Sequence, residues 1–284
     1  MPTFTDKAKR LDRIRLVLKG RYGEQPKPII THPVEHALRT ILGEEATCKQ
    51  VEEALERMRA HFGDWNDLRV SRPREIRETL GADFPSAADK ARVIPRLLDQ
   101  VFKRHNSMVW DFLEGMGKIA TRAYFERLEE VRPFVAAAMA RDCVGAHAFP
   151  VDRDVARVLD RLDILDPENQ SESWMQAFLE RAVKNTRVYE THQLVKRLGE
   201  DRCITGTPLC GRCPLNNTCP SAVITAKKVK RKEPKRAPEK KTRKSETASS
   251  RRRKVARKRT ASRRKARKGK SSGPPAKRSN RGPN

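Results

Sequence analysis

The segment DRCITGTPLCGRCPLNNTCPSA, residues 201–222, contains four of the six cysteines of the chain. Cys203, Cys210, Cys213 and Cys219 follow the spacing C-x6-C-x2-C-x5-C, so four thiolates can close around one centre using local loops only. Thiolate quartets hold structural zinc or an iron–sulfur cluster, and structural zinc usually takes two CxxC pairs brought together from a distance. The single CxxC favours a [4Fe-4S] cluster, with zinc or two disulfides as alternatives.

Positive charge is concentrated at the C-terminal end of the chain. The net charge is +27 over 284 residues, but residues 221–284 carry 27 Lys and Arg against three acids, leaving +3 for residues 1–220. This composition cannot bury enough apolar surface to offset its ordering entropy, so we expect disorder over residues 226–284. Such a tail can neutralise many phosphates and release their counterions, which favours nucleic acid as the partner.

The near-neutral part of the chain shows helical periodicity. Apolar residues recur at helical spacing in residues 34–42, 51–62, 155–162 and 194–198, and no stretch alternates with period two. These patterns predict an all-α fold, in which Gly199 would end the last helix in a left-handed conformation. No apolar run is long enough to cross a membrane and no leader precedes the first helix, so we expect a cytoplasmic protein associated with DNA.

The cysteine spacing, following a helix that ends in Leu-Gly, resembles the iron–sulfur loop of the endonuclease III superfamily of helix-hairpin-helix DNA glycosylases. HPVEHALRTILGEEAT, residues 32–47, is similar to an early helix of that family and its following turn, and DKAKRLDRIRLVL, residues 6–18, resembles its N-terminal helix. The resemblance covers nearly all of residues 5–220. It implies two helical domains with a central cleft, and a cluster that organises a DNA-facing basic loop, for which Arg212, Lys196, Arg197 and Arg202 are candidates.

Asp152, in HAFPVDRDVARVLDRL, follows an apolar residue and opens a helix, as the catalytic aspartate of the family does. Breaking an N-glycosidic bond builds positive charge on the sugar, and a carboxylate beneath it can stabilise that charge and activate the attacking water. Asp is also among the best helix N-caps, so the local sequence alone favours capping as the role of Asp152. The downstream cysteine loop favours the catalytic interpretation.

Two segments compete for the helix-hairpin-helix, whose L-x-G-x-G glycines place backbone N–H groups on a DNA phosphate. Residues 128–140, LEEVRPFVAAAMA, lie at the distance before Asp152 that the family requires, with Glu130 and Arg132 at the glycine positions. Residues 113–120, LEGMGKIA, keep both glycines but need an insertion before the aspartate. We prefer residues 128–135, because they need no gap and precede an Ala-rich helix.

The hairpin assignment bears on strand cleavage. Bifunctional members of the family use a lysine after the hairpin as an amine nucleophile, and the matching position in the preferred alignment is Phe134. Neither alignment supplies this lysine, so lyase activity is not expected. The position matching the family's base-gap-filling glutamine is Glu45. The resemblance therefore maps the DNA-contacting positions onto Glu45, Glu130, Arg132, Phe134 and Arg212.

The sequence thus predicts a monomeric DNA base-excision glycosylase that binds double-stranded DNA and flips a nucleotide towards Asp152, with the substrate base not readable. The expected division is an N-terminal helix at 1–25 joining the iron–sulfur domain, a helical domain at 26–134, the iron–sulfur domain at 135–225 and the tail at 226–284. The main alternative is a non-catalytic iron–sulfur DNA-binding protein on the same scaffold. A zinc-dependent architectural protein is a third class.

Overall fold

A computed structural model describes residues 2–166, 168–169 and 171–222 of the chain. These residues belong to the first of two compact units, Met1–Lys227. Their α-helices are α1 (Phe4–Tyr22), α2 (Pro33–Leu42), α3 (Cys48–Phe62), α4 (Trp65–Val70), α5 (Pro73–Leu80), α6 (Ala87–His105), α7 (Lys118–Glu126), α8 (Pro133–Val144), α9 (Arg153–Arg161), α10 (Glu172–Ala182) and α11 (Asn185–Asp201). Two short 3₁₀ helices, η1 (Asp111–Leu113) and η2 (Cys210–Arg212), complete the set within the described ranges.

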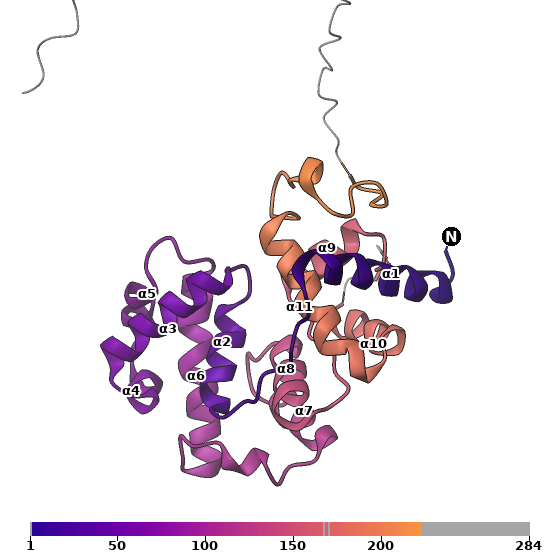
Figure 1. The fold of residues 1–284 in the computed structure, drawn as a ribbon. Coiled ribbons are helices and arrows are strands. Elements are labelled where there is room, and N and C mark those ends of the chain that lie inside the picture. The colour runs from indigo at the N-terminus through magenta and orange to yellow at the C-terminus, as the bar shows by residue number, and fades with distance from the viewer. Residues whose placement is uncertain (1, 167, 170, 223–284) are drawn as a thin grey trace, which may run out of the picture. The chain divides into compact units, whose positions relative to one another are not determined.

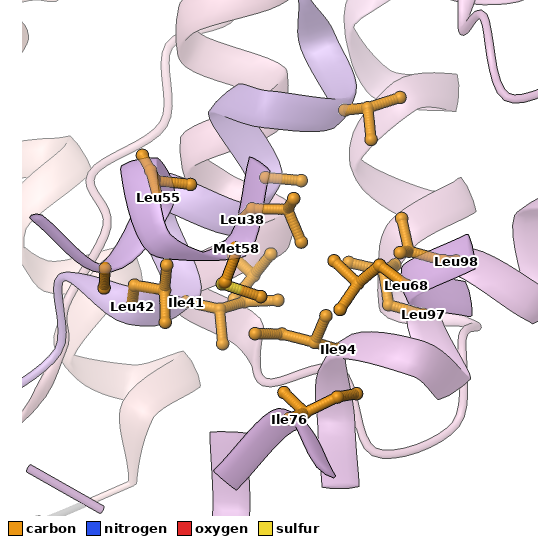
Figure 2. Packing of buried hydrophobic residues seen from close by; sticks show 14 of the residues in the cluster. Leu38, Ile41, Leu42, Leu55, Met58, Leu68, Ile76, Ile94, Leu97 and Leu98 are labelled. Atoms are coloured by element: carbon orange, nitrogen blue, oxygen red, sulfur yellow. The ribbon is translucent and has the colours of Figure 1, made fainter. Parts of the chain in front are cut away.

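The first hydrophobic core is built by α2 to α8. Helix α3 shows how the sequence produces it: Thr47 and Gln50 form a capping box that starts the helix, and the residues predicted to share one face are buried. Figure 2 shows Leu55 and Met58 of α3 facing Leu38 and Ile41 of α2, with Ile94 of α6 beside them. The core continues to Met139 in α8.

The second hydrophobic core joins the two ends of the described chain. Leu11, Ile14 and Leu18 of α1 pack with apolar residues of α9, α10 and α11 and with Leu215 of the cysteine loop. Arg15 adds a salt bridge, its Nη1 lying 2.7 Å from Glu190 Oε2 of α11. In Figure 1 the indigo α1 accordingly lies against the orange C-terminal helices. The N-terminal helix therefore packs with the segment that carries the cysteines.

Helix α8 is almost completely enclosed. Its residues 134–142 are all buried, and the helix packs against α7, α2 and α10. A helix that is apolar around its whole circumference must have neighbours on every side. Asp152 lies a short loop after the end of α8. The position of this buried helix therefore restricts where Asp152 can lie.

The structure confirms the predicted all-α fold. In the ranges that the structure describes, no helix combines the length and apolar character of a membrane span. The expected disordered tail at 226–284 lies outside the described residues, and the expected domain boundaries stay a prediction.

The expectation for Gly199 is wrong. The residue does not end α11, which runs on to Asp201, and it does not have a positive φ. A Cβ at this position would lie 3.2 Å from Cγ2 of Val158 in α9. The absence of a side chain therefore lets α9 and α11 approach closely, and this brings Asp152 next to α11.

Replacing Gly199 with Leu should destabilise the protein by about 1–3 kcal/mol, because the new side chain overpacks the contact with α9. The matched control is Gly20→Ala in α1, where no atom lies within 4 Å of the added Cβ and the helix gains up to about 1 kcal/mol from propensity. Denaturant unfolding measures both free energies. A Gly199→Leu variant as stable as the wild type would contradict the close packing.

Candidate active site

Asp152 both caps a helix and faces a cavity. Its Oδ1 accepts a hydrogen bond from the backbone N–H of Val155 at 2.8 Å, which is the N-cap bond of α9. Its Oδ2 accepts from the Nζ of Lys196. The side chain is only 6% exposed, and the residue lines the cavity. Capping uses Oδ1 only, so it does not exclude a second role for this carboxylate.

Lys196 reaches this carboxylate from α11. Its Nζ also donates to the carbonyl oxygen of Gly43 at 2.6 Å and lies 3.4 Å from Oδ2 of Asp154. Burial disfavours the ammonium form, but Asp152 and Asp154 outweigh it and raise the pKa of Lys196. The expectation that Lys196 contributes to an exposed DNA-facing surface is wrong, because its side chain is 13% exposed.

Asp154 connects the same ion cluster to the turn after α2. Its Oδ2 accepts from the backbone N–H of Glu45 at 2.8 Å, and its Oδ1 accepts from Nη1 of Arg157 at 2.6 Å. Burial works against the charged form, yet Lys196 and Arg157 hold the pKa of Asp154 below its usual value. Asp152, Asp154 and Lys196, which we call the ion cluster, thus join α9, α11 and the turn.

Glu45 has a left-handed backbone, with φ of 61°. A non-glycine residue adopts this conformation only where its surroundings enforce it, and the hydrogen bond to Asp154 does so here. The Glu45 carboxylate accepts from Oγ of Ser86 at 2.7 Å and from Nη1 of Arg153 at 3.2 Å. The position that the resemblance assigns to DNA contact therefore lies at a rigid turn, with its charge partly neutralised.

Helices α7 and α8 and the turn between them form a helical hairpin at the preferred segment. Glu130, at the first glycine position, has φ of 63°, the left-handed conformation that the motif needs there. In the competing segment Gly117 has φ of −67° and Gly115 does not have a positive φ. Of the two segments, residues 128–135 thus have the left-handed conformation at the first glycine position, whereas Arg132, at the second, has φ of −74°.

The side chains at the glycine positions of this hairpin are held in ion pairs. Glu130 pairs with Arg92 and Arg96 of α6. Arg132 pairs with Glu44 and Glu172, and its guanidinium lies 5.0 Å from the centre of the Phe134 ring. The charges that replace the glycines are thus compensated within the protein.

Phe134 lies in the first turn of α8, is 4% exposed and lines the same cavity as Asp152. The cavity has a volume of about 180 Å³. It lies among α2, α3, α8 and α11, and the polar side chains along it include His36, Cys48, Arg141, Asp142, Asp152, His192, Lys196 and Glu200.

The cavity holds polar groups whose hydrogen-bonding capacity is not used. Arg141 donates from Nε and Nη2 to Asp142, while its Nη1 is buried without a partner. Nδ1 of His192 is likewise buried without a partner, and desolvation lowers the pKa of this histidine well below its usual value. Unpaired buried polar groups are costly, so they favour a ligand that supplies partners.

The four cysteines of the loop line one small cavity, together with Leu198 and Pro208 among others. All four are free thiols, so the disulfide alternative is not observed. Burial raises the pKa of Cys213 and Cys219, and the other cysteines of the loop raise both further. Arg161 braces the loop by donating from Nη1 to the carbonyl oxygens of Cys203 at 3.3 Å and Ile204 at 2.8 Å.

Within residues 2–166, 168–169 and 171–222, no three Cys, His, Asp or Glu side chains are grouped so as to hold one metal ion. Four thiols around one cavity fit a group with several metal atoms, because each thiolate then binds a different corner of it. Arg212, in η2, is exposed at the edge of this loop.

The sequence did not predict that Asp152, Asp154 and Lys196 form an ion cluster. A signal was present for Lys196, because His192, Val195, Lys196 and Gly199 share one helical face by their spacing, and that face is buried. No comparable local pattern marks Asp154, whose partners lie in the turn after α2.

Comparison with solved structures finds the same fold. A non-covalent endonuclease III–DNA complex aligns with a TM-score of 0.60 and 20% identity, covering 78% of this chain and 97% of that chain. A trapped endonuclease III–DNA covalent intermediate aligns at 0.59 and 20%, covering 78% and 98%. A thermostable thymine-DNA glycosylase aligns at 0.55 and 16%, covering 76% and 96%.

The chain has the endonuclease III fold. The resemblance predicted from the cysteine loop is confirmed at this level. No protein-family model matches the sequence, and no curated protein matches it significantly. This chain therefore shares its fold with these solved structures, although no more than 20% of the residues are identical in any of the three.

Asp142 provides a test of the cavity wall. Its carboxylate is almost fully buried, and although burial opposes ionisation, Arg141 and His36 hold its pKa far below the ordinary value. A depressed carboxyl pKa stabilises the fold above the unfolded pKa of about 3.9 and loses this contribution as the pH falls. Asp142→Asn should therefore cost about 3–5 kcal/mol at pH 7 and progressively less below about pH 4.

Thermal or denaturant unfolding across this pH range measures the difference. Asp160→Asn, at an exposed position of α9, is the matched control and should show no such pH dependence. A stability loss for Asp142→Asn that is the same at pH 7 and below pH 4 would contradict the ionised carboxylate.

Proposed function

We propose that this protein is a DNA N-glycosylase that releases a damaged or mismatched base through Asp152. The observation that carries the proposal is the carboxylate of Asp152, which lines a cavity on a fold shared with DNA glycosylases. A capping aspartate without a cavity would support no chemistry. Here the cap fixes the orientation of the carboxylate through Oδ1, while Oδ2 is paired with Lys196, which lines the same cavity.

The proposed reaction places an extruded nucleotide in the cavity, with its sugar above Asp152. As the bond between base and sugar breaks, the sugar gains positive charge, and the carboxylate stabilises this charge and activates a water molecule for attack. The unpaired Nη1 of Arg141 and Nδ1 of His192 would then bind polar atoms of the base. Which base they select stays open, because each group can serve more than one hydrogen-bonding pattern.

We propose that Cys203, Cys210, Cys213 and Cys219 hold a [4Fe-4S] cluster. The shared cavity, the free thiols and the C-x6-C-x2-C-x5-C spacing with its single CxxC support this assignment. The cluster would have a structural role, cross-linking the loop that carries Arg212. Arg212 would then contact the DNA backbone as a phosphate ligand.

Duplex DNA is the proposed partner, bound by a monomer, and the proposed location is the cytoplasm in association with DNA. The charge of +24 over residues 221–284 supports a tether that adds salt-sensitive affinity without sequence information. At the hairpin, Glu130 and its two arginines would lie near the phosphate that the hairpin N–H groups bind.

The rival function is a non-catalytic iron–sulfur DNA-binding protein. It is favoured by the ion pairs at the hairpin, where Glu130 and Arg132 replace glycines, and by Phe134 at the position matching the family's lysine. These departures concern DNA contact and strand cleavage, whereas Asp152 and its cavity are intact. We therefore favour the enzyme.

Asp152→Asn should reduce base release by at least about 100-fold, because the carboxylate that stabilises the charged sugar is lost. Asn still caps a helix well, so the fold and DNA binding should persist. The measurement follows base release from duplexes with oxidised or mismatched bases, and Asp160→Asn is the control on the same helix. Intact DNA binding without base release from any substrate by the wild type would establish the rival function.

Cys213→Ser should remove the visible absorption of an iron–sulfur cluster and lower the bound iron, whereas Cys143→Ser, outside the loop, should leave both unchanged. Anaerobic purification followed by metal analysis and absorption spectroscopy measures the effect. A colourless wild-type protein containing one zinc ion per chain would overturn the cluster assignment.

A further inference from the structure

A second cavity, of about 560 Å³, lies where α11 begins. Its wall is built by α1, by the segment between α1 and α2, by the end of α8 and by the first turns of α11. We propose that this cavity, which we call the α11 cavity, binds a phosphate group of a small ligand between the start of α11, Lys27 and Arg141. The inference does not rest on the proposed function, because it needs neither DNA nor base release.

The start of α11 presents unpaired backbone donors to the α11 cavity. Asn185 and Thr186, the first two residues of this 17-residue helix, line the cavity, and the N-cap residue Lys184 makes no side-chain capping bond. In the same turn the N–H of Arg187 is already bonded to the carbonyl oxygen of Lys184 at 2.8 Å. The first N–H groups of a helix lack partners within it, and the helix dipole adds partial positive charge. An anion is therefore favoured at this end.

Arg141 adds a buried donor that has no partner. The residue is 4% exposed and lines both the α11 cavity and the Asp152 cavity. Its Nε and Nη2 form the edge of the planar guanidinium that faces Asp142, so Nη1 lies at the other edge. The guanidinium is 5.0 Å from the centre of the Tyr189 ring, which lines the α11 cavity. Nη1 carries two N–H groups, so one remains for a phosphate even if the other binds a base.

Lys27 supplies a charge that is not neutralised. Its Nζ donates to the carbonyl oxygen of Arg141 at 2.6 Å, and no carboxylate of the described residues lies within 4.0 Å of it. An ammonium group can donate three hydrogen bonds, so two are left for a ligand. The other cations of the wall are paired, namely Arg15 and Lys19 with Glu190, Arg187 with Asp12 and Arg141 with Asp142. Lys27 is therefore the cation of this wall that a phosphate can pair with.

The surroundings of the α11 cavity are positive as well. Arg187 also lines a neighbouring cavity of about 570 Å³, together with Lys9, Arg13 and Lys184. Asp12 is the acidic residue among the described residues that line this neighbour, and it is paired with Arg187. Residues 1–220 carry a net charge of only +3, so this concentration of cations is local. A ligand that approaches the start of α11 meets a positive potential.

The α11 cavity lies away from the hairpin. The hairpin turn precedes α8, whereas Gly145, at the other end of that helix, lines the cavity. Because a helix rises about 1.5 Å per residue, the 12 residues of α8 separate the two by about 18 Å. A volume of about 560 Å³ is typical of small-molecule sites. We therefore expect the phosphate to come from inorganic phosphate or a nucleotide rather than from a duplex held at the hairpin.

Hydrogen–deuterium exchange of the full chain tests the site, because it separates the α11 cavity from the basic residues 221–284, which also attract anions. Inorganic phosphate and ATP are the probes, compared with chloride at constant ionic strength. Exchange should slow in peptides covering residues 184–190, and the effect should saturate with probe concentration. Protection by phosphate alone identifies free phosphate as the ligand. Protection by ATP at lower concentrations than by phosphate identifies a nucleotide.

Lys27→Ala should weaken this protection by about 10-fold to 100-fold, because a charge-assisted hydrogen bond to the phosphate is lost. Lys27→Arg keeps the charge and should retain most of the affinity. Lys103→Ala, which removes an exposed cation of α6, is the matched control and should bind as the wild type does. Unchanged exchange of α3 in each variant shows that the fold is retained.

Two outcomes would overturn the inference. One is no protection of residues 184–190 by either probe up to about 10 mM, a range that includes weak sites. The other is a Lys27→Ala variant that keeps its fold and binds both probes as tightly as the wild type. Neither outcome bears on base release, so the proposed glycosylase is tested separately.

Discussion

The contact between Lys196 and the two carboxylates of Asp152 and Asp154 is the interaction on which the candidate site depends. It joins α11, the N-terminus of α9 and, through the backbone N–H of Glu45, the turn after α2. Two of these elements belong to the second hydrophobic core and the turn adjoins the first. A buried charge group is stable only when its members are paired, so loss of Lys196 would leave the buried carboxylate of Asp152 without its counter-charge.

The same contact explains how Asp152 can cap a helix and also line a cavity. Asp152 retains a helix-capping bond through one oxygen, so its orientation is fixed by α9. The other oxygen is paired with Nζ of Lys196, which compensates the charge of a buried carboxylate. Asp152 thus keeps its capping bond and its ion pair while lining the cavity in which the proposed reaction takes place.

Much of the fold could be predicted because local patterns determine it. The capping box at Thr47 and the apolar face of α3 define a helix and its buried side, and the cysteine spacing identified the related fold. The lysine at Asp152 could not be predicted by alignment, because its position depends on how closely α9 and α11 pack. Gly199 permits that approach, and its sequence context suggested a helix end instead. Likewise, the ion pairs of Glu130 and Arg132 connect residues 34 or more positions apart, which no local pattern reports.

A crystal structure of the protein with a duplex carrying a stable abasic-site analogue would test the central claim most directly. The account predicts that the analogue is turned out of the helix, with its sugar ring against Oδ2 of Asp152 and Nζ of Lys196. An analogue that remains within the duplex, with the protein bound only through the hairpin and the cysteine loop, would contradict it.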